Sequence, residues 1–515
     1  MHKNALISVS DKNGIVEFAR QIKEAGYRLL STGGTFKALQ EAGLEPVQVS
    51  DYAGSPEIME GRVKTLHPKI HGGILGRRDD ANDIKQAKEQ GIEWIDIVVV
   101  NLYPFEETVA SGADEATVIE NIDIGGPSML RSAAKNHQFV TVVTHPEDYE
   151  LVAKELVENG ETSLETRKLL AYKTFQRTSE YDRSIAFFMS KVSNQPEPLI
   201  LSYEKVKSLR YGENPHQKAA FFRNPDNHDA NITNATQLGG KELSFNNYVD
   251  GNSAIELVKE FERPTAVFIK HNNPCGIASS DTIEQAFKIG HQVDELSAFG
   301  CVIAVNREVT EEIVDYIKEK KMFVEIIVAP SFEAKALKRL QTRANLRLLA
   351  LGEMTRDADR RDIKKVAGGI LIQSADTTIL TEKDLKVVTQ KAPSKQEVDA
   401  MLFARKIVKH VTSNAVVFAK VDEQGNEFAT GIGAGQMSRV DSVFIASHKG
   451  GDKVPGSVMA SDAFFPFPDG VEGAHEAGVT SILQPGGSIR DDEVISRADE
   501  LGLSMVFTGI RSFKH

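Results

Sequence analysis

The first 190 residues alternate short apolar runs with amphipathic stretches, and this alternation most limits what the chain can fold into. Apolar runs typical of strands occupy 5–9, 27–30, 46–49, 95–100 and 139–143. Helical patterns lie between them, beginning near Ile15 and Phe36. Short apolar strands separated by helices indicate a parallel sheet covered on both faces. A longer helix is predicted over 163–189, with a capping box at Thr162 and Glu165.

A polar segment with two prolines, Ser193–Pro198, interrupts this pattern. Because proline cannot continue a helix, we place a linker at 194–200, between a domain at 1–193 and a domain at 201–515. Alternation then resumes, with strands predicted at 265–270, 301–305, 324–329, 366–373 and 414–420 and a helix at 395–410. We expect the second domain to divide into two lobes near residue 380.

Composition narrows the choice of partners and compartment. The chain carries 61 Lys and Arg against 73 Asp and Glu, a formal net charge of −12. Such a surface disfavours nucleic acid and anionic membranes, so an anionic substrate requires a local basic pocket. Two cysteines, Cys275 and Cys301, are too few for a disulfide framework and suit a reducing cytoplasm. We expect no signal peptide and no membrane-spanning segment.

Glycines and hydroxyls follow two predicted strands of the first domain. Ser31-Thr32-Gly33-Gly34-Thr35 lies between a strand and a helix, where backbone amides and the helix N-terminus favour a phosphate. A tight turn without ligand explains this segment about equally well. Ser8-Val9-Ser10-Asp11-Lys12 also ends a strand, and open α/β sheets usually bind ligands at that edge.

Three further polar segments of the first domain are candidates for chemistry. They are Glu60–Lys69, which is rich in cations, Asn101–Phe105, which holds Tyr103, and Ile122–Pro127, which holds Asp123. Each has an ordinary structural explanation, namely a solvated face, a packed phenol and a helix cap. Because several polar segments all follow predicted strands, one shared site at that edge of the sheet explains them better than separate structural roles do.

In the second domain, Lys270-His271-Asn272-Asn273-Pro274-Cys275-Gly276 follows a buried strand. An ammonium beside an imidazole at a strand end suits proton transfer next to a developing negative charge. Zinc deaminases carry an H-x-E and a P-C-x-x-C signature. Here the position three after Cys275 is Ala278 and no H-x-E precedes it within the second domain, which argues against zinc.

Taken together, these segments resemble the bifunctional purine-biosynthesis family that combines AICAR transformylase with IMP cyclohydrolase. The resemblance spans the whole chain and rests on ordered motifs: Ser8–Lys12, Val63–Pro68, Asn101–Phe105, Ile122–Gly126, Ala133–Asn136, Leu209–Gln217, Lys270–His271, Ser297–Gly300, Gly433–Arg439 and Ser461–Phe467. Asn272 and Cys301 look like local variants of the family pattern.

The resemblance implies two reactions and an α/β fold. The C-terminal domain would transfer the formyl group of 10-formyltetrahydrofolate to the 5-amine of AICAR. The N-terminal domain would close formyl-AICAR to IMP with loss of water. The implied architecture is a methylglyoxal-synthase-like parallel-sheet domain followed by a duplicated cytidine-deaminase-like domain.

The resemblance also implies site residues. Formyl transfer would use Lys270 and His271, and ring closure would use Lys64, Tyr103, Asp123 and Lys135, with Asp123 paired to Lys135. The ring-closing pocket would hold substrate with Ser10, Lys12, Ser31, Thr32, Gly33, Gly34, Thr35, Arg62 and Thr65. The nucleotide pocket of the transformylase would contain Arg210, Tyr211, Gly300, Asn414, Arg439, Phe464 and Arg511.

Partners are implied by the same resemblance: the small molecules AICAR, formyl-AICAR and folate, and a second copy of the chain in a homodimer, with transformylase pockets built across the interface. No zinc is expected, and potassium near Asp462 follows by analogy only. Two alternatives stay open at this point. One is a zinc-dependent deaminase or hydrolase acting on a nucleotide base, and the other is a non-catalytic first domain that senses a phosphorylated metabolite.

Overall fold

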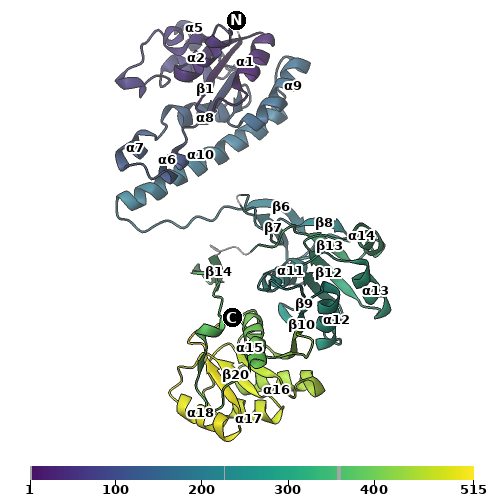
Figure 1. The fold of residues 1–515 in the computed structure, drawn as a ribbon. Coiled ribbons are helices and arrows are strands. Elements are labelled where there is room, and N and C mark those ends of the chain that lie inside the picture. Colours follow the sequence, from purple (N-terminus) through teal and green to yellow (C-terminus); the bar gives the residue numbers. More distant parts are fainter. Residues whose placement is uncertain (1–2, 226, 356–360) are drawn as a thin grey trace. The chain divides into compact units, whose positions relative to one another are not determined.

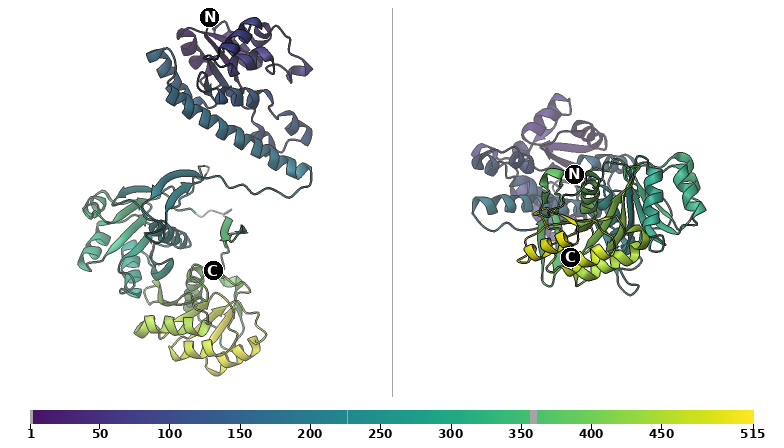
Figure 2. Two further views of the ribbon diagram at one scale, coloured as in Figure 1. Left: turned by 180° about the vertical axis from the view of Figure 1, so that it is seen from behind. Right: turned by 60° about the horizontal axis from the view of Figure 1, so that its bottom comes forward.

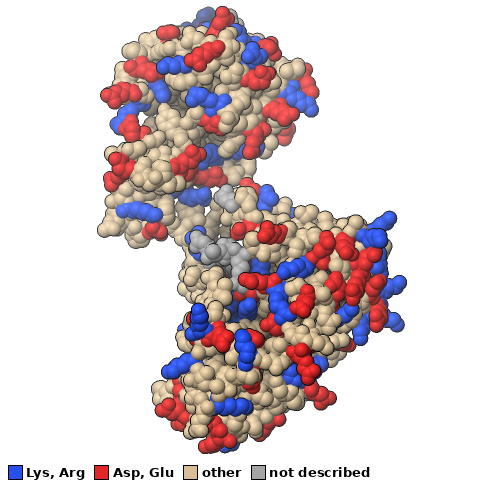
Figure 3. All heavy atoms as spheres, viewed as in Figure 1, with Lys and Arg blue, Asp and Glu red and all other residues tan. Residues whose placement is uncertain are grey.

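The computed structural model describes residues 3–225, 227–355 and 361–515 and divides into two compact units, Met1–Leu201 and Ser202–His515 (Figure 1). The predicted linker at 194–200 lies at the end of the first unit. On the face drawn in Figure 3, cationic and anionic side chains are interspersed over both units. None of the helices in the described ranges combines the length and the apolar character needed to cross a membrane.

The first unit is built on a parallel sheet of five strands among its described residues, in the order β3-β2-β1-β4-β5. The strands are β1 (Lys3–Val9), β2 (Tyr27–Ser31), β3 (Val47–Gln48), β4 (Ile97–Asn101) and β5 (Thr141–Val143). The predicted runs are therefore confirmed as strands. They read as continuous apolar segments because both faces of the sheet are covered.

Helices follow these strands as right-handed crossovers require. The chain moves from β1 to β2 in one direction and from β4 to β5 in the other, which places the connecting helices on opposite faces. The direction reverses between β1 and β4, the point where open sheets bind ligands. The helices of this unit are α1 (Ile15–Glu24), α2 (Gly33–Glu41), α3 (Val49–Ala53), α4 (Pro68–Leu75), α5 (Ala81–Glu89), α6 (Phe105–Ala110), α7 (Glu115–Glu120), α8 (Gly125–Lys135), α9 (Tyr149–Asn159) and α10 (Leu164–Val192).

The longest helix, α10, begins one residue later than the predicted capping box requires. Ser163 is its N-cap, and the Ser163 hydroxyl accepts a hydrogen bond from the backbone N–H of Thr166. The predicted box at Thr162 and Glu165 is wrong. Thr162 is instead buried, with its hydroxyl 2.6 Å from that of Thr141.

The second unit holds a continuous sheet of twelve strands among its described residues, in the order β16-β21-β20-β19-β17-β18-β10-β9-β11-β12-β13-β8. The strands of the first lobe are β8 (Thr236–Gly239), β9 (Thr265–Lys270), β10 (Asn273–Ser279), β11 (Cys301–Val305), β12 (Val324–Ala329) and β13 (Arg347–Ala350). Those of the second are β16 (Lys386–Val387), β17 (Val416–Val421), β18 (Glu427–Gly433), β19 (Val458–Ser461), β20 (Ser481–Gln484) and β21 (Ser504–Phe507). The lobes join where β10 pairs with β18.

The two lobes repeat one topology, which shows the duplication that the resemblance implied. Each has an antiparallel hairpin (β9–β10, β17–β18), a third strand antiparallel to the first, and two more strands parallel to the third. In each lobe a strand glycine lets a helix approach. A Cβ on Gly276 would lie 2.1 Å from the Gly290 carbonyl oxygen, and one on Gly433 would lie 1.9 Å from that of Ser442.

Helices cover both faces of this sheet (Figure 2). A shared core holds apolar side chains of α11 (Phe245–Val258), α15 (Lys395–Val408) and strands of both lobes. The other face carries one core per lobe, under α12 (Ile283–Val293), α13 (Glu311–Glu319) and α14 (Ala334–Leu340) in the first lobe, and under α16 (Arg439–Gly450), α17 (Asp469–Glu476) and α18 (Asp491–Glu500) in the second.

Two hairpins lie outside the large sheet: β6 (Glu204–Leu209) with β7 (Ala219–Arg223), and β14 (Arg361–Val366) with β15 (Gly369–Ser374). The strand predicted at 366–373 is confirmed in part as β15, but its first residues form the end of β14 and the turn, and it lies outside the large sheet. Gly368, at a φ of 79°, turns the chain back, and the side chains of this hairpin are largely exposed. The apolar residues at 366–373 belong to a two-stranded hairpin, and hydrophobic periodicity alone does not distinguish such a hairpin from a strand of the core.

Candidate functional sites

The first site is a cavity of about 660 Å³ at the carboxyl ends of β1, β2 and β4. Its lining contains most of the residues predicted for ring closure: Ser10, Lys12, Thr32, Gly33, Gly34, Thr35, Arg62, Lys64, Thr65, Tyr103 and Asp123. Two predicted residues do not line it. Ser31 is fully buried, with its hydroxyl donating to the Ile7 carbonyl, and Lys135 is exposed at the far end of α8.

Backbone and side-chain bonds shape the phosphate-type loop of this cavity. The Thr35 hydroxyl donates to the Val9 carbonyl and accepts from the Val9 N–H, which ties the start of α2 to the end of β1. The Asn101 side-chain oxygen accepts from the backbone N–H groups of Ser10 and Asp11. Asn101 therefore fixes the loop that presents Ser10 and Lys12. Sequence analysis included Asn101 in a motif but gave it no role in the site.

Polar groups of the cavity already contact one another. The Lys64 ammonium donates to the Tyr103 hydroxyl at 3.2 Å. The Thr32 hydroxyl donates to Glu57 at 2.7 Å, and Arg62 pairs with Glu120. Two residues predicted to hold the substrate, Thr32 and Arg62, thus contact carboxylates that an anionic ligand would have to displace.

Asp123 lies before the N-terminus of α8 and is half-buried. Its Oδ1 accepts from the Gly126 N–H at 2.8 Å, and its own N–H donates to the Tyr181 hydroxyl at 2.8 Å. Burial raises the pKa of Asp123, while hydrogen bonds from the backbones of Gly126 and Tyr103 and the charge of Lys64 oppose this rise. The carboxyl group therefore holds a proton more readily than an exposed aspartate, as a proton-transfer group requires.

Within one chain, Lys135 does not reach Asp123, so the predicted pairing of these residues is wrong at this level. Nine residues separate Gly126 from Lys135 along α8, which at 1.5 Å per residue amounts to about 13 Å. The pairing was implied by the family resemblance alone, and the motifs at 122–126 and 133–136 lie at opposite ends of α8.

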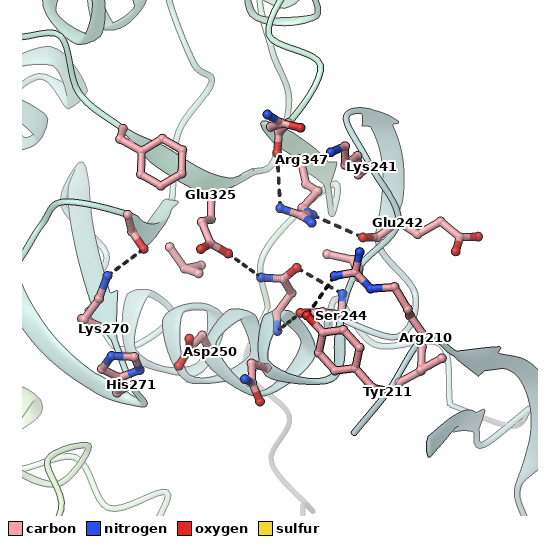
Figure 4. Close-up of a pocket in the computed structure, with 18 residues that line it drawn as sticks. Arg210, Tyr211, Lys241, Glu242, Ser244, Asp250, Lys270, His271, Glu325 and Arg347 are labelled. Carbon is pink, nitrogen blue, oxygen red and sulfur yellow. Dashed lines mark hydrogen bonds between the residues drawn. The ribbon is translucent and has the colours of Figure 1, made fainter. Parts of the chain in front are cut away.

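The second site is a cavity of about 680 Å³ in the first lobe of the second unit (Figure 4). The ends of β9, β11, β12 and β13 meet at this edge of the sheet, with α11 alongside. Of the predicted residues it contains Arg210, Tyr211, Lys270, His271 and Gly300. It also contains polar residues that sequence analysis missed: Lys241, Glu242, Ser244, Asn247, Asp250, Glu325 and Arg347.

Lys270 is held at two points. Its ammonium donates to the Phe299 carbonyl at 2.7 Å and to the Gly300 carbonyl at 3.2 Å, which leaves one N–H for another acceptor. Gly300 has a φ of 71°, and a Cβ there would lie 3.2 Å from the Lys270 nitrogen. A glycine is therefore suited to this predicted pocket position, because a side chain there would lie too close to the Lys270 ammonium.

The opposite end of the cavity is basic. Arg210 donates to the Tyr211 hydroxyl at 2.9 Å and lies over its ring (Figure 4). Burial lowers the pKa of Arg347, and the neighbouring charge of Arg210 lowers it further, against the opposing effect of Glu325. Two guanidinium groups that repel each other mark a position where an anion is favoured.

The remaining predicted transformylase residues do not line this cavity. The Arg439 guanidinium donates to Asn414 Oδ1 at 3.0 and 3.1 Å and to the Phe464 carbonyl at 3.3 Å, and lies 3.0 Å from Asp462 Oδ1. Arg511 is exposed near the C-terminus. Burial lowers the pKa of Arg439, which Asp462 counteracts. The prediction of Arg439 as a free phosphate ligand is not supported in the single chain.

Both groups of residues nevertheless lie along one edge of the sheet. His271 follows β9, Asn414 precedes β17, and Asp462 follows β19. The strand order places three strand spacings between β9 and β17, or about 14 Å at 4.8 Å each. The sequence placed His271 and Asn414 at the ends of predicted strands but could not give the distance between them.

Comparison with known proteins identifies the chain. A family model described as "AICARFT/IMPCHase bienzyme" matches residues 133–449, and one described as "MGS-like domain" matches 14–128. Proteins named "Bifunctional purine biosynthesis protein PurH" from Bacillus cereus (strain B4264) and Bacillus anthracis (strain CDC 684 / NRRL 3495) are each 49% identical over 518 residues, covering 100% of both chains. The chain belongs to the AICARFT/IMPCHase bienzyme family.

As a member of this family, the chain is a bifunctional enzyme of purine biosynthesis, with AICAR formyltransferase and IMP cyclohydrolase activity. The predicted family, fold class and function are confirmed, and the deaminase and sensor alternatives are set aside. Among the described residues, no three His, Cys, Asp or Glu side chains gather as a metal site.

Proposed function

We propose that the second unit takes the formyl group from 10-formyltetrahydrofolate and transfers it to the 5-amine of AICAR at the Lys270–His271 edge. The amine nitrogen attacks the formyl carbon and gives its proton to the His271 imidazole. The remaining N–H of Lys270 stabilises the negative charge on the formyl oxygen. The bond between the formyl carbon and folate N10 then breaks, and N10 takes up a proton.

The geometry of Lys270 carries this assignment. Two carbonyl oxygens hold the ammonium, so it meets an oxyanion without reorganising. Arg210 and Arg347 at the other end of the cavity suit the AICAR phosphate, because a guanidinium contacts two oxygens at once. The ring of Phe323, which lines the cavity, lies 5.3 Å from that of Phe299 and offers an aromatic face to the folate ring system.

For ring closure, the first unit binds formyl-AICAR with its phosphate at the start of α2 and at Lys12 and Arg62. The carboxamide nitrogen attacks the formyl carbon, and the oxygen leaves as water. Lys64 and Tyr103, which are hydrogen-bonded, supply two protons to the departing oxygen. Asp123 accepts one proton from the amide, and the formamide N–H gives up the second proton as the ring double bond forms. Because the attack is intramolecular, holding the two groups together provides much of the rate.

The separation of the transformylase residues supports a homodimer with pockets built across the interface. In this arrangement, Asn414, Arg439, Phe464 and Arg511 of a second copy complete the cavity that holds His271. A mixture of His271→Ala and Arg511→Ala chains tests this. In each mixed dimer one of the two pockets would be intact, so a randomly exchanged mixture, about half of it mixed dimers, would regain about a quarter of wild-type formyl transfer. Activity no greater than the sum of the two variants alone would refute shared pockets.

The proposal also covers the cosubstrate, the cellular compartment and the metal ions of the enzyme. The enzyme uses the folate as cosubstrate, works in the cytoplasm and needs no zinc. Potassium near Asp462 stays a prediction by analogy, because Asp462 Oδ1 is already 3.0 Å from Arg439 and Oδ2 accepts from Ser413. No step above uses a cation.

The decisive experiment is to incubate the purified protein with AICAR and 10-formyltetrahydrofolate and to follow IMP. Formation of IMP without added metal supports the proposal. Stoichiometric zinc together with loss of activity on chelation would favour a deaminase-type enzyme. Binding of formyl-AICAR by residues 1–193 without turnover would favour a sensor.

A further inference from the structure

His271 occupies an unusual backbone position. It and Asn272 form the two-residue turn between β9 and β10, with Lys270 paired to Asn273 across the hairpin. Their φ angles are 51° and 63°. Both lie in the left-handed region, as the central residues of a type I′ turn do. Glycine adopts this region freely, whereas a residue with a side chain requires support from its surroundings.

The support comes from α11. The backbone N–H of Asn272 donates to Asp250 Oδ1 at 2.8 Å. With its amide nitrogen facing the helix, the Asn272 side chain lies 3.2 Å from Asp250 Oδ1 and 3.3 Å from both the Val249 carbonyl and the Ser253 hydroxyl. The carboxylate and the carbonyl are acceptors only, so this amide orientation is the one that satisfies them. One carboxylate oxygen therefore receives two donors from the turn.

We propose that Asp250 is a positioning residue for formyl transfer: it fixes the left-handed turn and thereby presents the His271 imidazole to the cavity. This inference rests on the proposed function of His271. Asp250 lines the same cavity from the helix side, as Figure 4 shows. Its Oδ1 accepts from the backbone of the turn, so the carboxylate is tied to the segment that carries His271.

Three variants separate positioning from proton transfer. Asp250→Ala removes the acceptor, and we expect kcat for formyl transfer to fall about 10²-fold with KM for AICAR within about twofold, because a displacement near 1 Å has that effect on a reacting group. Asp250→Asn keeps an acceptor oxygen and is expected to retain kcat within about fivefold. Ser253→Ala, a matched control on the same helix, contacts only the Asn272 side chain and should leave kcat within about twofold.

A rescue tests the backbone argument directly. Asn272→Gly in the Asp250→Ala background removes the conformational cost at the second turn position, so we expect at least a fivefold recovery of kcat. An Asp250→Asn variant as inactive as Asp250→Ala would overturn the proposal in favour of proton transfer. Absence of any recovery with Asn272→Gly would overturn it as well.

A structural readout keeps the test independent of the reaction. In a crystal structure of the Asp250→Ala protein, we expect the His271–Asn272 turn to leave the φ values of 51° and 63°. An unchanged turn in a variant that has lost activity would refute positioning. If the wild-type protein formed no formyl-AICAR, the proposed function would fail, while the turn could still be examined in this way.

Discussion

Replacing Gly126 with alanine should nearly abolish ring closure without removing any functional group. A Cβ at this position would lie 2.3 Å from Asp123 Oδ2 and 2.9 Å from a methyl carbon of Leu102. Ordinary contact begins at 3.4 Å, so the carboxylate must retreat by 3.4 − 2.3 = 1.1 Å. The Leu102 side chain is buried and limits relief on its side. A displacement of this size in a reacting group reduces the rate about 10²-fold, equivalent to about 2.7 kcal/mol in the activation barrier.

The assay is the conversion of supplied formyl-AICAR to IMP by the purified full-length variant. Formyl transfer to AICAR, which takes place in the other unit, serves as an internal control and should be unchanged. Gly34→Ala is the matched control, since its Cβ would lie 3.6 Å from two atoms of the Lys12 side chain, an ordinary contact. It should alter KM at most. A Gly126→Ala enzyme that closes the ring within threefold of the wild-type kcat would refute a positional requirement for Asp123.

Three further outcomes are expected. His271→Ala should stop formyl transfer yet still cyclise supplied formyl-AICAR, and Lys64→Ala, which removes the partner of the Tyr103 hydroxyl, should show the reverse; a shared defect in both steps contradicts independent sites. Because burial raises the pKa of Asp123 above its ordinary value of 3.8, its ionised form opposes folding, and this cost grows as the pH rises toward the folded-state pKa. Asp123→Asn should therefore raise Tm at pH 7, with the gain shrinking toward pH 4, and an unchanged Tm at both pH values would show that the carboxyl is not buried. Dialysis against a chelator should leave both activities intact, and zinc-restorable loss would count against the mechanism.

The first unit could be predicted well from sequence because its chemistry follows its strands. Segments after β1, β2 and β4 converge at the sheet edge where the crossover direction reverses, so a list of strand ends is nearly a list of site residues. The exceptions are instructive. Ser31 lies in the right loop but points into the core, and Lys135 lies on the right helix but at its wrong end. Direction and length along an element are three-dimensional properties that a motif does not record.

The second unit could be predicted less completely because its cavity draws on elements without a recognisable motif. Asn247 and Asp250 belong to α11, and Glu325 and Arg347 start β12 and β13. Each reads as an ordinary polar residue at the end or on the face of an element. Their role emerges from register: β11, β12 and β13 run parallel, so the residues that begin them share one edge with the end of antiparallel β9.

The duplication explains why Arg439 is buried when sequence analysis expected a free phosphate ligand. Asn306 and Asp462 occupy equivalent positions, directly after β11 and directly after β19. The backbone N–H of Asn306 donates to the carbonyl of Thr265, at the start of β9, and that of Asp462 donates to the carbonyl of Ala415, just before β17. In the first lobe this position is a neutral amide whose hydrogen bonds are made by the backbone. In the second lobe this position is a buried carboxylate, which requires a partner charge, and Arg439 supplies that charge.

Arg439→Met should therefore destabilise the second lobe, because it leaves the Asp462 carboxylate without a charged partner. Arg439→Met combined with Asp462→Asn should restore much of the loss in Tm, and no recovery would show that the charge pair is not what Arg439 contributes to stability.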